Sequence, residues 1–270
     1  MGLFKTERLE DINVLVTGAS GGIGAATAIL FARAGANVLI TARREAELEK
    51  VKSLAIKANE EGGTGKGGRV DILKLDMKDR SAVDNFLTKI PKDFKSIDIL
   101  VNNAGLVYGM DHVGDLNMDE VETMINTNVL GLIRITNMIV KGMKERGKGH
   151  IINLGSIAGR EPYAGGSVYC ATKHAVNAFS GALLRELVST PIRVSEIQPG
   201  MVETEFSVTR FRGDRSKADS VYEGLKPLTA EDIAEEVAWC ASRPPHVNVA
   251  ELFVLPTSQA SPTINYRGKK

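Results

Sequence analysis

The chain alternates between short hydrophobic runs and longer stretches in which hydrophobic and polar residues recur with the period of a helix. The short runs are rich in β-branched residues, which is typical of strands. They predict strands at 13–16, 37–41, 70–75, 97–101, 151–154, 193–197 and 250–255. The longer stretches predict helices at 23–34, 45–60, 119–146, 167–189 and 229–241, and one that begins at 81–87.

This order predicts how the elements assemble. Parallel strands must be joined by crossovers long enough to hold a helix, so regular alternation favours a parallel sheet with helices on both faces. We therefore expect an α/β fold, a Rossmann-type doubly wound sheet of about seven strands. Neither a repeat nor a linker marks a boundary, so residues 1–270 are predicted to form a single domain.

Two segments depart from the alternation. Residues 61–69 (EGGTGKGGR) are Gly-rich, but they lack the spacing of a phosphate loop and precede a strand. We interpret them as a flexible surface connection. Residues 206–228 are charged and irregular, and they follow the strand end at Pro199-Gly200. Long excursions at this edge of a sheet are usually functional, which predicts a substrate lid within the domain.

The composition narrows the function classes. With 43% hydrophobic residues, 25% charged residues and a net charge of +1, the chain gives no electrostatic reason to expect nucleic acid as a partner. Two cysteines, Cys170 and Cys240, make neither a disulfide framework nor a zinc pattern, which favours a reducing compartment. No segment resembles a signal peptide or membrane span, so we expect a cytoplasmic protein, with the nucleus also open. Met1-Gly2 with Thr6 fits the loose myristoylation pattern, which chance often matches.

A glycine-rich turn, TGASGGIG, spans residues 17–24 between the first predicted strand and the first predicted helix. Glycine permits a tight turn and lets backbone N–H groups approach a pyrophosphate at the positive end of the helix. The Ser hydroxyl within the turn is a further candidate contact to phosphate. The turn therefore predicts a dinucleotide site that includes Gly18, Ser20, Gly22, Ile23 and Gly24.

The residues that follow the second, third and fourth predicted strands indicate which dinucleotide would bind. About twenty residues on, where an NAD enzyme places an acid for the ribose hydroxyl, the chain has Arg43-Arg44. A guanidinium suits a 2′-phosphate, so NADP is the expected cofactor, and two solvated arginines are the alternative. Asp76 could accept a hydrogen bond from the adenine amino group, or cap the helix that begins near Ser81. Small residues at the fourth strand end would let the chain pass close to the cofactor: Asn103, Ala104 and Gly105.

Four polar residues suggest the chemistry. Tyr169 and Lys173 are four residues apart and share one helix face. A nearby ammonium and an oxidised nicotinamide would favour the phenolate and lower the tyrosine pKa, so that Tyr169 could exchange a proton with an alcohol or carbonyl. Ser156, thirteen residues before Tyr169, would hold the same substrate oxygen. Asn128 lies mid-helix, where binding a water that relays protons to Lys173 would explain it.

Together these motifs resemble the short-chain dehydrogenases/reductases over essentially the whole chain. The matching motifs are TGASGGIG, the Asp76 strand end, NNAG, NTNVLG, Ser156, YCATK and Pro199-Gly200. The resemblance implies a catalytic tetrad of Asn128, Ser156, Tyr169 and Lys173, the last two also touching the cofactor. It implies nicotinamide contacts from Pro199, Gly200, Val202 and Thr204.

Four longer segments are similar to the fungal NADP-dependent 3-hydroxy acid dehydrogenases: INLGSIAGR, PYAGGSVYC, GMVETEFSVTRFRGD and VLPTSQASP. This implies an oxidoreductase that interconverts short 3-hydroxy acids, of the serine, L-allo-threonine or 3-hydroxypropionate type, and their 3-oxo forms. Family members are commonly homotetramers, which we expect here. Gly155 stands where the family often has a second serine, which marks a subgroup.

Two alternatives stay open. One is an NADPH-dependent carbonyl reductase for another substrate class, such as a 3-oxoacyl thioester, a quinone or a steroid. The other is a sensor that binds NADP without catalysis, against which the intact Ser-Tyr-Lys set argues. A hydroxy acid also carries a carboxylate that needs a partner once water is excluded. The candidate partners are Arg160, Arg210 and Arg212, each of which could instead be an ordinary solvated or interface arginine.

Several other residues are expected to have structural roles. His112, His150, His174 and His246 are scattered without ligand spacing, so no metal is predicted. Cys170 adjoins Tyr169 but faces away from it, which indicates packing. The apolar stripe on the long helix is expected to be core or subunit interface: Met138, Ile139 and Met143.

Overall fold

The computed structural model describes residues 5–268, and the predicted acylation site at Gly2 lies outside them. Seven strands form one sheet in the order β3-β2-β1-β4-β5-β6-β7, and every neighbouring pair is parallel. The predicted Rossmann-type doubly wound fold is therefore confirmed. The strands are β1 (Asn13–Thr17), β2 (Asn37–Ala42), β3 (Val70–Lys74), β4 (Ile99–Asn102), β5 (Gly149–Leu154), β6 (Ile192–Pro199) and β7 (Glu251–Val254).

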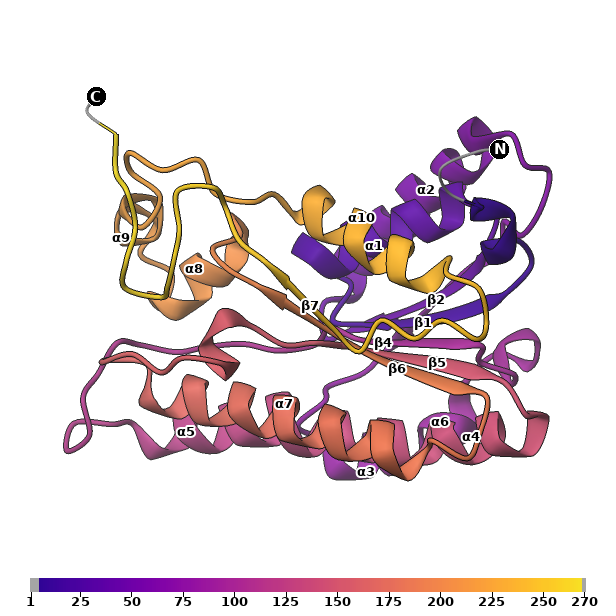
Figure 1. Ribbon diagram of the computed structural model, residues 1–270, viewed down its shortest axis with the longest axis horizontal. Coiled ribbons are helices and arrows are strands. Elements are labelled where there is room, and N and C mark those ends of the chain that lie inside the picture. Colours follow the sequence, from indigo (N-terminus) through magenta and orange to yellow (C-terminus); the bar gives the residue numbers. More distant parts are fainter. Residues whose placement is uncertain (1–4, 269–270) are drawn as a thin grey trace.

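Helices cover both faces of the sheet (Figure 1). One layer holds α1 (Gly22–Arg33), α2 (Glu45–Gly62) and α10 (Ala230–Ala241), and Phe31, Leu48 and Val237 from these three helices are buried in one hydrophobic cluster. A second cluster buries Phe86, Ile135 and Leu183 on the opposite face. The helices of that layer are α3 (Arg80–Asp84), α4 (Phe86–Lys89), α5 (Met118–Ile125), α6 (Leu132–Arg146) and α7 (Ser167–Glu186).

Local sequence explains where several helices begin and end. Gly63 and Gly147 follow α2 and α6 in the left-handed conformation, which glycine adopts without a steric penalty. The Thr229 hydroxyl accepts from the Asp232 N–H while the Asp232 carboxylate accepts from the Thr229 N–H, which forms a capping box at the start of α10. These caps fix the helix boundaries within one or two residues of those predicted.

Two predictions about local structure are wrong. The predicted helix over 119–146 is interrupted by a π-helix, Asn126–Gly131, which joins α5 to α6. The segment 206–228 is not irregular, because it holds most of α8 (Glu205–Arg210) and all of α9 (Arg215–Ser220). Asp214 caps α9 by accepting from the Lys217 N–H. The segment 61–69 is a surface turn, as predicted, and the Gly67 N–H donates to the Asp11 carboxylate at 2.9 Å.

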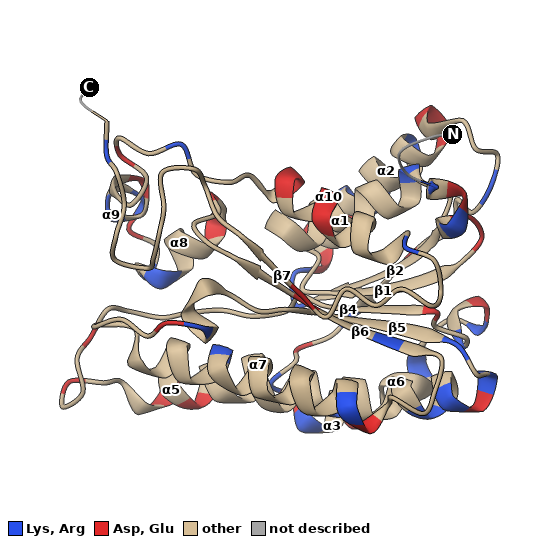
Figure 2. Cartoon of the chain, viewed as in Figure 1, with Lys and Arg blue, Asp and Glu red and all other residues tan. Residues whose placement is uncertain are grey.

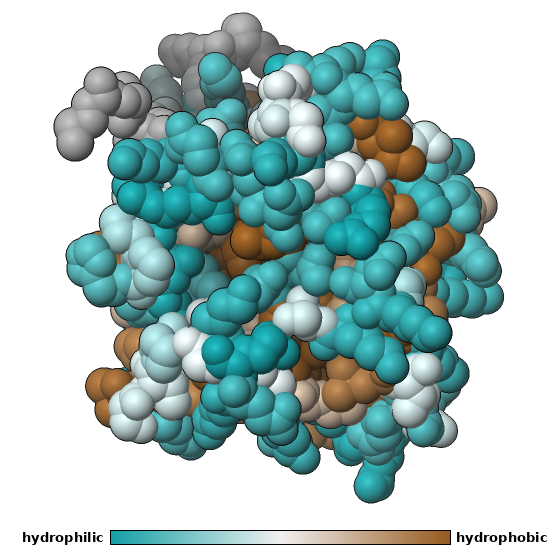
Figure 3. Space-filling model, turned by 90° about the vertical axis from the view of Figure 1, so that its right-hand side faces the viewer, coloured by the Kyte–Doolittle hydropathy of each residue, from teal (hydrophilic) through white to brown (hydrophobic). Residues whose placement is uncertain are grey.

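Charged residues of both signs lie on helices of both layers (Figure 2). The face at which the strands begin is mostly hydrophilic, with hydrophobic residues between the polar ones (Figure 3). Within residues 5–268, no helix has the length and apolar composition of a membrane span.

Candidate active site

The strand order reverses between β1 and β4, whose outer neighbours are β2 and β5. At such a switch point the loops leave the carboxyl ends of the two strands in opposite directions, which opens a crevice for a ligand. A cleft occupies this place and extends toward α8. Every predicted cofactor residue except Gly24 lines it, together with Ser156. Residues missed by the sequence analysis also line it, among them Thr127, Phe206 and Thr209.

The glycine-rich turn is held against the end of β4. Gly18 has a φ of +68°, and a Cβ there would lie 2.6 Å from the Ala104 Cα. The Asn103 side chain donates to the carbonyls of Thr17 and Gly18 at 2.9 and 3.1 Å. A Cβ on Gly24 would lie 2.4 Å from the Asn103 Nδ2. Gly24 therefore lets α1 pack against β4, while Gly18 and Gly22 shape the cleft itself.

Two guanidinium groups lie at the β2 end of the cleft. Arg43 and Arg44 are exposed, and the Arg44 side chain donates to the Ser20 Oγ at 3.1 and 3.3 Å. Neither arginine has an acidic partner within ion-pair distance among the residues the structure describes. Their positive charge is thus available at the site where the sequence predicts a 2′-phosphate.

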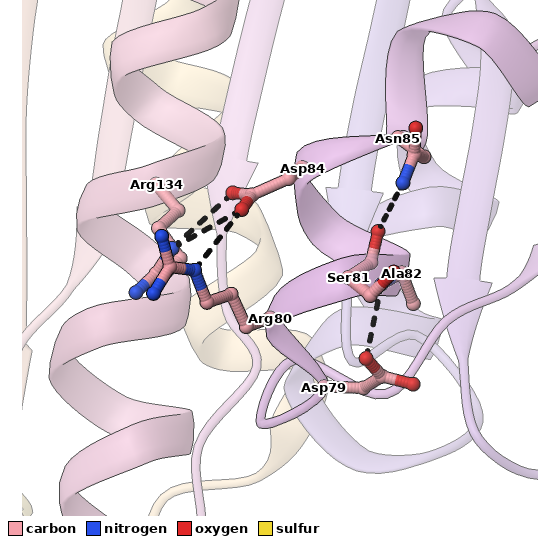
Figure 4. Close-up of polar contacts among 7 residues, drawn as sticks. All are labelled: Asp79, Arg80, Ser81, Ala82, Asp84, Asn85 and Arg134. Carbon is pink, nitrogen blue, oxygen red and sulfur yellow. Dashed lines mark hydrogen bonds and ion pairs between the residues drawn. The ribbon is translucent and has the colours of Figure 1, made fainter.

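The structure decides between the two roles considered for Asp76. The first turn of α3 is capped by Asp79, whose carboxylate accepts from the Ala82 N–H at 3.0 Å (Figure 4). The capping alternative for Asp76 is therefore wrong. Asp76 lines the cleft, and its carboxylate accepts from the Lys78 N–H at 3.1 Å. Its contact with adenine stays a prediction.

Three predicted catalytic side chains converge on the other end of the cleft. Tyr169 and Lys173 lie on one face of α7, and Ser156 follows β5; each is at most 8% exposed. The Lys173 Nζ lies 5.9 Å from the centre of the Tyr169 ring and donates to the Leu154 carbonyl at 2.7 Å. The Ser156 Oγ accepts from the Ala158 N–H at 3.1 Å. The backbone thus fixes both Ser156 and Lys173 beside Tyr169.

Asn128, by contrast, does not line the cleft. It lies in the π-helix, where its amide oxygen accepts from the Leu106 N–H at 2.9 Å. Its amide nitrogen donates to the Leu106 carbonyl at 2.8 Å and to the Thr172 Oγ1 at 3.1 Å. Asn128 therefore ties the segment after β4 to α7, and its predicted water relay to Lys173 stays a prediction. Single π-helical turns often occur at functional sites.

Burial strongly affects both titratable groups. It raises the pKa of Tyr169 well above its usual range, opposed first by the charge of Arg210 and then by a hydrogen bond with Ser156. The sequence analysis did not anticipate the charge of Arg210, and the effect it expected from Lys173 together with an oxidised nicotinamide stays a prediction. Burial lowers the pKa of Lys173 to about 8, and the charge of Glu196 opposes this shift.

Comparison with known proteins identifies the family. A family model described as short chain dehydrogenase matches residues 12–214. The chain belongs to the short-chain dehydrogenase family. An NADP-dependent 3-hydroxy acid dehydrogenase of Schizosaccharomyces pombe is 45% identical over 262 residues, which cover 96% of this chain and 98% of the relative.

Two further similarities are informative. Sulfoacetaldehyde reductase 2 of Chromohalobacter salexigens is 40% identical over 253 residues, 93% of this chain and 96% of the relative. A solved closed form of serine dehydrogenase with NADP+ has a TM-score of 0.86 and 41% identity, and the match covers 96% of this chain and all of that one.

A buried acid lies behind the site, and the sequence analysis missed it. Glu196, on β6, is 1% exposed and accepts from the Asn177 side chain at 3.0 Å. A Cβ on Gly155 would lie only 2.2 Å from its carboxylate oxygen. This explains why Gly155 replaces the serine common in the family, because the carboxylate of Glu196 fills the space that a side chain would need.

The residues set aside in the sequence analysis lie in the core or at the surface. His150 is buried and hydrogen-bonds the Ser195 Oγ at 2.8 Å, and burial holds the pKa of this imidazole well below its usual range. His112, His174 and His246 are exposed. Cys170 packs with the cluster around Tyr169. Ile139 and Met143 belong to the core rather than to an exposed interface, and Met138 packs against it.

The position of Glu196 leads to a prediction about pH dependence. Its negative charge raises the pKa of Lys173, so Glu196→Gln should lower that pKa. The ammonium is then lost at lower pH, and the alkaline limb of the pH profile of kcat/KM should move to lower pH. Gln keeps the shape and an acceptor for Asn177. Glu186→Gln, an exposed acid at the end of α7, is the control. Identical profiles for Glu196→Gln and the parent would show that the two groups are not coupled.

Proposed function

We propose that the chain is an NADP-dependent oxidoreductase that interconverts short 3-hydroxy acids and their 3-oxo forms. The observation that carries the proposal is one cleft that joins a glycine turn and two exposed arginines at one end to Ser156, Tyr169 and Lys173 at the other. The names of the S. pombe and serine dehydrogenase relatives support the cofactor and the substrate class. The sulfoacetaldehyde reductase relative, at a somewhat lower identity, supports the alternative of a reductase for another carbonyl substrate.

The residues of the cleft fit the cofactor. Gly18 and Gly22 would hold the pyrophosphate, and a Cβ on Gly22 would touch the Thr204 side chain at 3.4 Å, which shows how narrow the cradle is. Arg43 and Arg44 would bind the 2′-phosphate. Pro199, Gly200, Val202 and Thr204 would contact the nicotinamide end. NADP, when bound, accepts or supplies the hydride.

The protein's own contribution is to move a proton and hold the substrate. In reduction Tyr169 donates its hydroxyl proton to the carbonyl oxygen, and in oxidation it accepts the proton of the alcohol. Ser156 hydrogen-bonds the same oxygen. Lys173 stabilises the phenolate by its charge, while Asn128 and the Leu154 carbonyl hold Lys173 and its helix in place.

The lid and the assembly are part of the proposal. Residues 206–228 would close over the substrate, since Phe206 and Thr209 on α8 already line the cleft. The Tyr222 hydroxyl donates to the Val202 carbonyl at 3.0 Å, so the lid is anchored to the predicted nicotinamide segment. A homotetramer is expected from the family resemblance alone, and a cytoplasmic location from the sequence analysis.

The chemistry is tested by removing one oxygen. Tyr169→Phe should retain the fold and NADPH binding but lose about 100-fold or more of kcat, because general acid–base catalysis contributes about 10²–10⁴. Reduction of NADP+ with L-serine, L-allo-threonine and 3-hydroxypropionate measures turnover, and NADPH fluorescence measures binding. Tyr266→Phe, at an exposed position, is the matched control. Undiminished turnover by Tyr169→Phe contradicts its role. Binding without turnover by the parent protein favours a sensor.

Cofactor selectivity gives a second test. Arg43→Ala and Arg44→Ala should each weaken NADPH about ten-fold or more, since a charge-assisted hydrogen bond contributes about 1.5–3 kcal/mol. NADH, which has no 2′-phosphate, should lose little affinity. Arg33→Ala, another exposed arginine, provides the control for a general charge effect. Equal losses for NADPH and NADH would mean that the arginines do not bind the 2′-phosphate.

A further inference from the structure

The structure separates the three arginines that could bind a substrate carboxylate. Arg212 is already paired: its side chain donates to Asp111 at 2.6 Å and to Glu120 at 2.7 and 2.8 Å. Arg160 pairs with Glu251 at 3.0 Å and stacks on Phe253. Both side chains therefore already have carboxylate partners.

Arg210 has a different environment. It ends α8, and its guanidinium carbon lies 5.6 Å from the ring centre of Tyr169 and 5.9 Å from those of Tyr163 and Phe206. One nitrogen donates to the Tyr163 hydroxyl at 2.8 Å. Its Nε is buried without a hydrogen-bond partner, and no carboxylate within residues 5–268 pairs with the side chain. A buried donor without a partner is costly, which indicates that a partner arrives from outside the chain.

We propose that the Arg210 guanidinium binds the anionic group of the substrate; this inference rests on the proposed function. The reacting oxygen would lie at Tyr169, whose ring Arg210 faces. In a 3-hydroxy acid only one carbon separates the carbinol carbon from the carboxylate, so both groups must be bound close together. The guanidinium offers parallel N–H donors that match a carboxylate.

The comparisons are consistent with this chemistry. The substrate named for one relative, sulfoacetaldehyde, also carries an anionic group next to a short carbonyl chain. A guanidinium binds a sulfonate and a carboxylate through the same oxygen acceptors. Arg210 also belongs to the proposed lid, whose closure would bring its charge and the aromatic rings over the substrate together. The Gly109 N–H donates to the Arg210 carbonyl at 2.8 Å, which holds this end of α8 against the opposite wall.

The test compares a charged substrate with an uncharged one of the same shape. We would measure kcat/KM for 3-hydroxypropionate and for its methyl ester, with NADP+, in the parent, Arg210→Met and Arg212→Met. The ratio of acid to ester should fall about ten- to one hundred-fold in Arg210→Met, as expected for a lost charge-assisted contact. Arg212→Met removes a cation from the same lid and should leave the ratio unchanged. An unchanged ratio in Arg210→Met overturns the proposal.

A binding measurement tests the same proposal in variants that have no measurable activity. Malonate is an unreactive three-carbon dianion, and its affinity for the enzyme–NADP+ complex can be measured by calorimetry. Arg210→Met should weaken malonate about ten-fold or more, with NADP+ affinity retained. Equal malonate affinity in both proteins overturns the proposal for Arg210. If the parent turns over no hydroxy acid at all, the proposed function fails, and the malonate comparison still decides whether Arg210 binds an anion.

Discussion

The site depends on the junction between the carboxyl ends of β1 and β4. The Thr17 hydroxyl accepts from the N–H groups of Asn103 and Ala104 at 3.1 Å, and Asn103 returns two hydrogen bonds to the carbonyls of the glycine turn. With Gly18 pressed against Ala104, these contacts fix both walls of the cleft at the switch point. Buried polar groups must be paired, so this network tolerates little movement and presents the turn in one conformation.

Beyond that junction lie the charged side chains that surround Tyr169. The segment after β4 is held by Asn128, which also reaches α7, where Tyr169 and Lys173 lie. Lys173 lines the cleft and Glu196 lies behind it; both are buried, and burial alone would favour their neutral forms. Gly155 provides the room for the carboxylate. The protein thus keeps a cation near Tyr169 by burying an acid close to it, and a second cation, Arg210, lies at the end of α8.

Most of the fold and much of the candidate site were predictable because they depend on local sequence. Strands and helices follow hydrophobic periodicity, and the glycine turn, Ser156, Tyr169 and Lys173 have spacings that place them at strand ends or on one helix face. The π-helix was not predictable, since the residues of Asn126–Gly131 show no pattern that distinguishes its i→i+5 hydrogen bonds from those of an α-helix. The helices α8 and α9 have six residues each, too few for a periodic pattern. Glu196 was missed because a charged residue in a strand is normally expected to face solvent, whereas nearly all of β6 is buried. The choice among the arginines depends on acids about one hundred residues away, Asp111 and Glu120.

The most direct measurement follows a label from substrate to cofactor. With 3-hydroxypropionate deuterated at the carbinol carbon and unlabelled NADP+, mass spectrometry of the reduced cofactor reports where the deuterium goes. A proton moved by Tyr169 and a hydride moved to NADP have different destinations, since only the former exchanges with water. The account predicts one deuterium in each molecule of NADPH formed. NADPH without deuterium, or deuterium released to water, would contradict it.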